Sequence, residues 1–587
     1  MNDTSSRGYL SDFGTLAPYL KRFQLRLSLV FPLVIAVVMV DLIQPYLVKV
    51  AIDRYVAVAA PNERAILLMA AGYLGVVLLS CALTYYQEIV LQYAGQSIVR
   101  AIRIDLFRHI QTLALRYFDQ NSPGRIITNV VSDTEALNNF FTQFLSGMLR
   151  GLFSLLLIMG FMAQLDLKIA LYCFILIPVV AAIAVFFQRR MRAINTEVRN
   201  RLGSAIAFLA ENLQGMPIIQ IFHQEAKQQK RFDERNRLLV HATIRENWYF
   251  LLFFNVTELL GDLGIAALIW YGGRSVLGGV LSFGILYAFI GYIRRFFQPI
   301  NTISQQMNTF QSSLVATERI AATLREKPDI QEQAGAVAPE IRGEVRFEKV
   351  SLAYRQDHPV LVDIGLKIRP GERVGFVGAT GAGKSSLMNL VTRFYDTSSG
   401  RVVVDGKDVR DWPLEALRKT IGIVQQDVTL FSGSVVDNIR FFQEEIGEER
   451  VREACRLVGA EPFILRLPQG YDTPLSERAA TLSAGERQLL SFARVLVFDP
   501  RILILDEATA NLDSRTEEVL QRAIHRVSAG RTLLVIAHRL ATVQEMDRIV
   551  VLDRGRIIES GSHDDLLVRG GHYWQLHRSG ILLDEAV

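Results

Sequence analysis

The feature that most constrains this chain is a series of six apolar stretches, each long enough to cross a lipid bilayer. They lie near residues 25–50, 64–92, 138–163, 168–188, 248–273 and 280–305. A spanning helix needs about 20 mostly apolar residues, because the hydrocarbon layer is about 30 Å thick. Lipid offers the backbone no hydrogen-bond partners, so such stretches form helices. Residues 1–325 are therefore predicted to form a six-span helical membrane domain.

Positive charge gives this domain an orientation. Arginine and lysine gather in two long connections, 94–137 and 189–247, and are sparse in the short ones near 53–63, 164–167 and 273–280. Because positively charged loops stay on the cytoplasmic side, both termini and both long connections are expected there. The long connections are charged and helix-periodic, so they are predicted to extend the spanning helices below the membrane. The first twenty residues are polar, and no cleavable signal peptide is expected.

Several polar side chains fall within the predicted spans: Asp41, Gln44, Glu88, Glu258, Asp262, Arg294 and Arg295. Ionisable groups at membrane depth are costly and usually face a cavity or a partner group. Glu258 and Asp262 are four residues apart, so they share one helix face. Two interpretations remain open for them: pairing between helices, or an acidic patch that favours cationic substrates.

Composition separates the chain into two kinds of sequence. Apolar residues make up 50% and charged residues 21%, which fits a membrane half followed by a soluble half. The net charge of +5 does not indicate a nucleic-acid partner. Cys81, Cys173 and Cys455 are too far apart to match a metal or disulfide spacing. A polar stretch at 326–342 reads as a linker, and 343–587 shows an α/β pattern.

The strongest local signal is a phosphate-binding loop between an apolar strand and a helix. The sequence Gly378-Ala-Thr-Gly-Ala-Gly-Lys-Ser385 matches the P-loop pattern in full. Its glycines let backbone N–H groups close around phosphates, and the N-terminus of the following helix favours negative charge. Lys384 is expected to reach the β- and γ-phosphates of ATP, and Ser385 to bind Mg²⁺. The predicted nucleotide-binding residues of this segment are Gly378, Thr380, Gly381, Ala382, Gly383, Lys384, Ser385 and Ser386.

A second signal, a pair of acidic residues at the end of an apolar run, follows the P-loop. Four apolar residues, 502–505, form a predicted buried strand that ends in Asp506 and Glu507. Asp506 is expected to hold Mg²⁺, directly or through water. Glu507 is expected to polarise the water that attacks ATP.

Residues 343–580 closely resemble the nucleotide-binding domain of ABC transporters. The specific evidence is Leu482-Ser-Ala-Gly-Glu486, which looks like the family's signature and stands just ahead of the acidic strand. The six spans fused before this domain are similar to the exporter layout. The resemblance therefore implies an α-helical six-span membrane domain followed by an α/β P-loop NTPase domain of the ABC type.

The resemblance assigns roles to further residues. Tyr354 matches the aromatic that stacks on adenine, with a core tyrosine as the alternative. Gln426 matches the glutamine that contacts Mg²⁺ and the attacking water. Asp513 lies in the loop that crosses to the partner, and His538 matches the histidine that contacts the γ-phosphate. Ser483, Gly485 and Glu486 belong to the signature, which the family presents to ATP bound by a second subunit.

Two departures from the family bear on that second subunit. Ala484 stands where the signature usually has glycine, and Glu486 where it usually has glutamine. The P-loop, Asp506, Glu507 and His538 are intact. This mixture favours one half of a heterodimer, with a homodimer as the alternative. The family also implies that two cytoplasmic helical turns, within 115–121 and 212–217, press on the ATPase.

The expected function is therefore ATP-driven export, or flipping between leaflets, of an amphiphilic substrate. ATP and Mg²⁺ are the expected cofactors, and the lipid bilayer and a second half-transporter the expected partners. The alternatives are an ATP-gated channel or regulator, whose ATPases usually lack the base that Glu507 supplies, and a soluble ABC ATPase, against which the six spans argue. The absence of an organelle presequence suggests a bacterial inner membrane, with the nucleotide-binding domain in the cytoplasm.

Overall fold

The computed structural model describes residues 5–56, 63–333, 335–355, 358–475, 482–506, 514–536 and 540–578. Glu507, Asp513 and His538 lie outside the described residues, as do residues 476–480 before the signature. The chain forms two compact units. The first comprises Met1–Gln111 and Ser122–Glu326, and the second comprises Thr112–Asn121 and Lys327–Val587.

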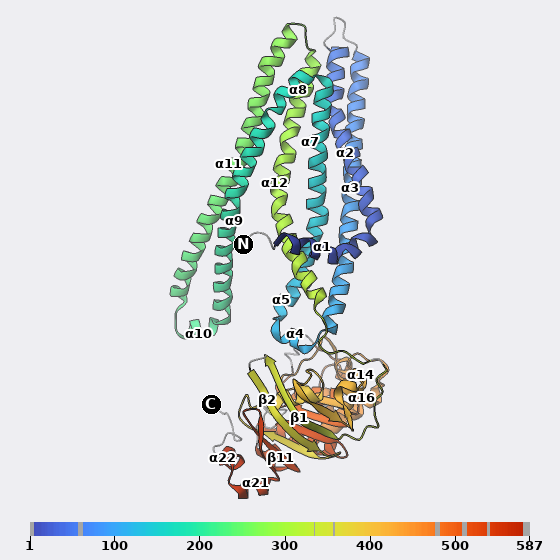
Figure 1. The fold of residues 1–587 in the computed structure, drawn as a ribbon, viewed down its shortest axis with the longest axis vertical. Helices are drawn as coiled ribbons and strands as arrows, with labels where there is room; N and C mark the ends of the chain where they lie inside the picture. The colour runs from blue at the N-terminus through green and yellow to red at the C-terminus, as the bar shows by residue number, and fades with distance from the viewer. Residues whose placement is uncertain are drawn as a thin grey trace. The chain divides into compact units, whose positions relative to one another are not determined.

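All the secondary-structure elements of the first unit, within its described residues, are helices (Figure 1). Its long helices are α2 (Gln24–Ala51), α3 (Glu63–Thr112), α7 (Leu145–Leu165), α9 (Leu176–Gln214), α11 (Glu225–Leu277) and α12 (Phe283–Arg325). Shorter elements connect them: α1 (Ser5–Arg22), η1 (Ile52–Val56), α5 (Pro123–Thr128), η2 (Asn129–Asp133), α6 (Thr134–Asn139), η3 (Phe140–Phe144), α8 (Leu167–Phe174) and α10 (Met216–Ile221). α9 and α11 run side by side and are joined by α10, so the long connection at 189–247 is helical as expected (Figure 1).

Five of these helical segments are long and apolar enough to cross a membrane: Gln24–Val56, Glu63–Thr112, Pro123–Leu165, Leu167–Gln214 and Glu225–Leu277. The predicted sixth span at 280–305 falls in α12, which is not among the five. Its apolar run is interrupted by Arg294 and Arg295. In the second segment, Glu63–Thr112, only 6% of the most apolar stretch is buried inside the protein. Such an exposed apolar surface is typical of a helix that faces lipid rather than water.

Aliphatic and aromatic side chains of α2, α3, α7, α8, α9, α11 and α12 form the core of the membrane unit. Small residues allow the helices to approach closely. A Cβ at Gly264 of α11 would lie 2.7 Å from Leu176 Cδ1 of α9, and one at Gly272 would lie 2.7 Å from Leu286 Cδ1 of α12. Such small-residue contacts are typical of helix packing in membranes.

A polar network ties four helices of this unit together. The Asp41 carboxylate of α2 accepts hydrogen bonds from Ser80 of α3, at 2.5 Å, and from Arg150 Nη2 of α7, at 3.2 Å. Arg295 of α12 donates to the backbone carbonyl of Asp41 and, at 2.8 Å, to Gln44 Oε1. Mutual pairing lowers the cost of ionised groups at membrane depth, which explains their presence in these spans.

The second unit holds two main β-sheets. One is antiparallel, in the order β2-β1-β4-β5, and the other has six strands in the order β12-β11-β3-β10-β9-β6. The strands are β1 (Val345–Arg355), β2 (His358–Ile368), β3 (Arg373–Val377), β4 (Ser399–Val404), β5 (Lys407–Asp408), β6 (Ile421–Val424), β9 (Ile502–Asp506), β10 (Thr532–Ile536), β11 (Arg548–Asp553) and β12 (Arg556–Gly561); β7 (Gly433–Ser434) pairs with β8 (Pro474–Leu475).

The helices of this unit are α4 (Leu115–Gln120), α13 (Lys384–Val391), α14 (Leu414–Thr420), α15 (Val435–Ile439), α16 (Glu448–Val458), α17 (Glu461–Ile464), α18 (Ala484–Leu496), α19 (Ser514–Ser528), α20 (Leu540–Gln544), α21 (His563–Arg569) and α22 (His572–Arg578). In the six-stranded sheet, β11, β3, β10, β9 and β6 are mutually parallel. β3, β9 and β10 are almost fully buried, which accounts for their continuous apolar sequences.

Candidate nucleotide-binding site

The parallel sheet brings the predicted catalytic segments to one edge. Phe376 of β3 pairs with Ile536 of β10, and Ile536 pairs with Asp506 of β9. The P-loop follows β3 directly, and Gln426 comes two residues after β6 ends beside β9. Ligands of open α/β folds bind at the carboxyl ends of parallel strands. Residues far apart in the sequence therefore meet where a phosphate ligand is expected.

Two glycines of the P-loop are required by the backbone. Gly378 has φ +149°, and a Cβ there would approach the carbonyl oxygen of Leu552 more closely than the 3.0 Å that real Cβ atoms keep. Gly383 has φ +102°, and its Cβ would lie 2.6 Å from Leu361 Cδ2. Glycine alone adopts such angles without strain, and the loop can then curl closely in front of α13.

Lys384 is held over this loop. Its side chain is buried, at 6% exposure, and Nζ donates hydrogen bonds to the carbonyl oxygens of Gly378, at 2.8 Å, and Ala379, at 3.2 Å. Ser385, by contrast, is exposed in the first turn of α13, and Thr380 and Gly381 are exposed on the loop. Ala382 and Ser386 are buried, so they pack against the rest of the domain and support the loop. An ammonium group and a helix N-terminus thus face the same short loop, an arrangement suited to phosphate.

The residues at this edge also fit a hard divalent cation. Ser385 offers a hydroxyl, Asp506 a carboxylate and Gln426 an amide oxygen, and oxygen ligands in small number are what Mg²⁺ takes beside phosphates. No group of three or more histidine, cysteine, aspartate or glutamate side chains gathers within the described ranges, so nothing there resembles an all-protein metal cage.

Tyr354 lies on β1 and reaches the helix behind the P-loop. Its hydroxyl donates a 3.0 Å hydrogen bond to Ser386 Oγ, and its ring packs edge-on against Tyr395 with centroids 4.8 Å apart. The residue is half-buried against the core of this unit. These contacts are those of a partly buried tyrosine, and stacking on adenine stays a prediction.

Sequence reasoning missed Tyr395. Its hydroxyl donates a hydrogen bond to the Asp119 carboxylate of α4, the helical turn predicted to press on the ATPase. Arg116 of α4 also pairs with Asp329 at 3.7 Å. Burial, followed by the hydrogen bond to Asp119, raises the pKa of Tyr395 well above its usual range. The contact predicted for 115–121 is thus found, whereas the one for 212–217 stays a prediction.

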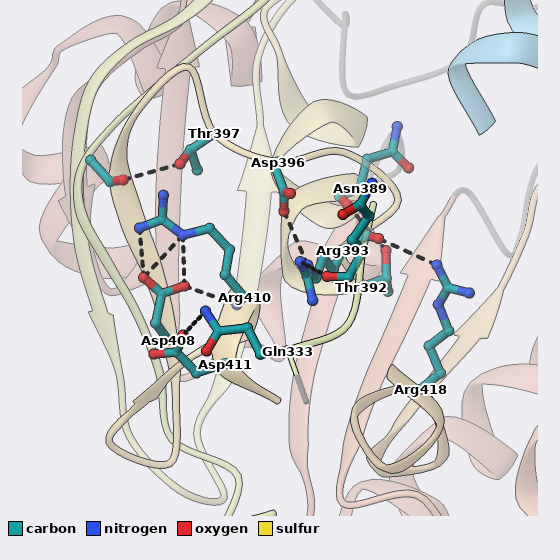
Figure 2. A network of polar contacts seen from close by, with 12 residues as sticks. Gln333, Asn389, Thr392, Arg393, Asp396, Thr397, Asp408, Arg410, Asp411 and Arg418 are labelled. Atoms are coloured by element: carbon teal, nitrogen blue, oxygen red, sulfur yellow. Dashed lines mark hydrogen bonds and ion pairs between the residues drawn. The ribbon is translucent and has the colours of Figure 1, made fainter. Parts of the chain in front are cut away.

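The linker is docked onto the nucleotide-binding unit by side-chain contacts. Figure 2 shows Gln333 donating to Asp411 and Arg393 paired with Asp396. Arg393, which is 3% exposed, also donates a 3.0 Å bond to the carbonyl of Gln331. Because Arg393 immediately precedes Phe394 and Tyr395, the linker and α4 attach to the same short segment.

The signature segment forms the start of α18. Ser483 is its N-cap, and Ser483 and Ala484 are exposed while Gly485 is buried. The Ser483 hydroxyl accepts a hydrogen bond from the Glu486 N–H at 3.2 Å, and the Glu486 carboxylate accepts one from the Ser483 N–H at 2.8 Å. This reciprocal pair is a capping box. Sequence reasoning noted the charge of Glu486 but not this bond.

Glu258 and Asp262 lie exposed on α11, on the same face. Within the described part of the chain neither forms an ion pair, unlike Asp41 with Arg150. Helix pairing inside one chain therefore does not account for them, and their role stays open. Arg294 of α12 is exposed as well.

Comparison with known proteins agrees with this geometry. Residues 27–300 match the family model described as ABC transporter transmembrane region, and residues 361–510 match the one described as ABC transporter. The chain is 39% identical over 88% of its length to a Bacillus subtilis protein named "Probable multidrug resistance ABC transporter ATP-binding/permease protein YheH", of which 77% is covered.

It is also 36% identical, over 84% of its length, to the ATP-dependent lipid A-core flippase of Syntrophus aciditrophicus, of which 82% is covered. Among solved structures, a bacterial Atm1-family ABC exporter with ATP bound superposes with a TM-score of 0.78 at 26% identity. That likeness covers 97% of this chain and 99% of the other.

Proposed function

The chain belongs to the ABC transporter family, and from that premise we propose that it exports an amphiphilic molecule from a bacterial cytoplasmic membrane. It is a multi-pass membrane protein, and its ATPase is coupled to transport. The observation that carries the proposal is the union, in one chain, of spanning helices with a P-loop whose sheet edge also holds Asp506 and Gln426.

Each residue of the sheet edge has a proposed role. Backbone N–H groups of the P-loop and of the start of α13 hold the phosphates of ATP. Lys384 exchanges its two carbonyl partners for the β- and γ-phosphates. Ser385, Asp506 and Gln426 would hold Mg²⁺, which supplies charge neutralisation on the phosphates when bound. Glu507 orients the attacking water as general base.

Three further roles come from the family alone. His538 contacts the γ-phosphate, and Tyr354 stacks on adenine. Asp513 lies in the loop that crosses to a second subunit.

The exporter layout implies dimerisation, and we propose that the signature serves the partner's ATP. Ser483 and Gly485 would donate to the γ-phosphate bound by the other subunit's P-loop, and this chain's P-loop would meet the other signature. Closure of the two nucleotide domains around ATP then favours one of two global states of the membrane domain. The altered signature supports a heterodimer, and a homodimer is the alternative.

The cargo is proposed as an amphiphile that enters from the lipid. One relative is named a lipid A-core flippase and another a probable multidrug resistance transporter, and a lipid is an amphiphile. Exposed polar groups on α11 and α12 would contact its headgroup. A dye-transport panel in proteoliposomes tests for charge preference. If Glu258→Gln lowers transport of cationic but not neutral dyes, the acidic patch selects cations. If the variant transports both classes of dye as the parent does, Glu258 does not take part in substrate selection.

ATP hydrolysis by the purified full-length chain in lipid nanodiscs tests the proposal. The variant Glu507→Gln should lower the rate by at least about 100-fold, because the general base is lost. Glu518→Gln is the matched control: its carboxylate is exposed on α19, and its activity should equal that of the parent. Undiminished hydrolysis in Glu507→Gln would contradict the proposed mechanism.

The same assay separates the two kinds of dimer. Robust hydrolysis by the chain alone indicates a homodimer with two working sites. Negligible hydrolysis in a folded chain that binds ATP indicates that the competent signature lies on another chain. Ionic current that requires ATP but moves no dye would instead support the ATP-gated channel.

A further inference from the structure

The first turn of α18 contains an internal anion. The Glu486 carboxylate lies against the N-terminus of the helix, where it accepts the 2.8 Å hydrogen bond from the Ser483 N–H. Ser483 and Ala484 are exposed, so this helix end is open to solvent in the single chain. The helix end therefore presents its own carboxylate to an approaching molecule.

Among the residues that the structure describes, Glu486 takes part in no ion pair. The adjacent Arg487 directs Nη1 to the carbonyl oxygen of Leu482, at 2.6 Å. The compensating positive charge is thus the partial charge of the helix N-terminus, equivalent to about half an elementary charge.

Under the proposed function, on which this inference rests, the same helix end meets the γ-phosphate bound by the partner. Two anions then lie at one helix end and share its dipole, and the carboxylate already occupies the Ser483 N–H. Because like charges a few ångströms apart repel even at the protein surface, each weakens the binding of the other. A glutamine at this position would keep the hydrogen bond but carry no charge, since the capping box accepts either residue.

We propose that Glu486 is a built-in competitor of the ATP γ-phosphate at the signature, and that it raises the ATP concentration needed to close the dimer. The capping box holds the carboxylate in place while the γ-phosphate is absent. When ATP arrives, the carboxylate has to leave the helix end or remain beside the phosphate at a cost. ADP has no γ-phosphate, so its binding to the P-loop does not meet this competitor.

The test compares the full-length parent with Glu486→Gln in nanodiscs. The substitution removes only the charge, so the KM for ATP should fall by roughly 10-fold, and the inhibition constant of ADP should stay the same. If the parent alone is inactive, the ATP concentration for half-maximal dimerisation should fall by the same factor in Glu486→Gln. The difference in KM should shrink in about 0.5 M NaCl, because salt screens exposed charges.

Two controls separate charge from structure. Glu448→Gln removes a carboxylate from the first turn of α16 in the same domain, and it should leave KM unchanged. Glu486→Ala removes the charge and the side-chain half of the capping box, while the Ser483 hydroxyl still accepts from the backbone N–H of residue 486, so it should lower KM and also lower the melting temperature. Equal KM values in the parent and Glu486→Gln would overturn the inference, as would equal ATP concentrations for half-maximal dimerisation where neither chain hydrolyses ATP alone. Failure of the proposed function would be seen separately, as hydrolysis that persists in Glu507→Gln.

Discussion

Gly378 offers a direct test of the P-loop geometry. Replacing it by alanine places a Cβ against the carbonyl oxygen of Leu552, closer than 3.0 Å, and within 3.2 Å of that residue's carbonyl carbon. The obstructing atoms are backbone of β11, a buried strand of the central sheet, so they have little room to yield. The loop itself must move by about 1 Å, and a misplacement of that size costs about 100-fold in rate.

Two other glycines calibrate the expected loss. Gly381 lies in the same loop at φ +82° but with nothing within 4 Å of its Cβ position, so Gly381→Ala adds backbone strain without a clash. Strain of about 1 kcal/mol corresponds to a loss of roughly fivefold. Gly365 on β2 has open space around it and no positive φ, so Gly365→Ala should be neutral.

The assay is the ATP dependence of hydrolysis for the three variants, with a thermal melt of each. We expect kcat/KM to fall by about 100-fold in Gly378→Ala and by about fivefold in Gly381→Ala, and to stay the same in Gly365→Ala. A Gly378→Ala protein that hydrolyses ATP within threefold of the parent would refute the argument, because the P-loop would then tolerate a shift that the structure forbids.

Three further perturbations follow from the packing. Tyr395→Phe deletes the hydrogen bond to Asp119, so dye transported per ATP hydrolysed should fall about threefold, measured in proteoliposomes; an unchanged ratio would remove this contact from coupling. Thr532→Val keeps the shape of a fully buried side chain but leaves a backbone carbonyl (2.6 Å) and a backbone N–H (3.0 Å) without their partner. It should destabilise the protein by about 2–4 kcal/mol, seen as a lower melting temperature. Asp41→Asn leaves Arg150 unpaired within the membrane unit and should cost about 2 kcal/mol in a detergent melt, whereas the double variant with Arg150→Met should recover most of it.

The sequence was most informative where structure depends on near neighbours. Long apolar runs identify five spanning segments, because lipid admits no other arrangement for them. The sixth predicted span lies in α12, where two arginines interrupt the apolar run. The P-loop and the strand that ends in Asp506 were likewise predictable, since each is recognised from a short run of consecutive residues.

The contacts that join these pieces depended on tertiary structure. Asp119 and Tyr395 are 276 positions apart, and no local pattern links them. Tyr354 was predicted to stack on adenine, but its hydrogen bond to Ser386 was not predictable from either segment. Arg150 was not singled out, because its partner Asp41 lies on another helix.

Glu486 shows both what the sequence determines and what only the structure determines. Its identity, and its departure from the signature, are plain in the sequence. Whether its carboxylate points to solvent or folds back onto the helix end is a matter of side-chain geometry, and the structure places it on the Ser483 N–H. The sequence by itself therefore determined which elements form and which chemical groups they carry. Only the packing of distant segments decided which groups meet, because those contacts depend on the sheet order and helix packing of the whole chain rather than on spacing along it.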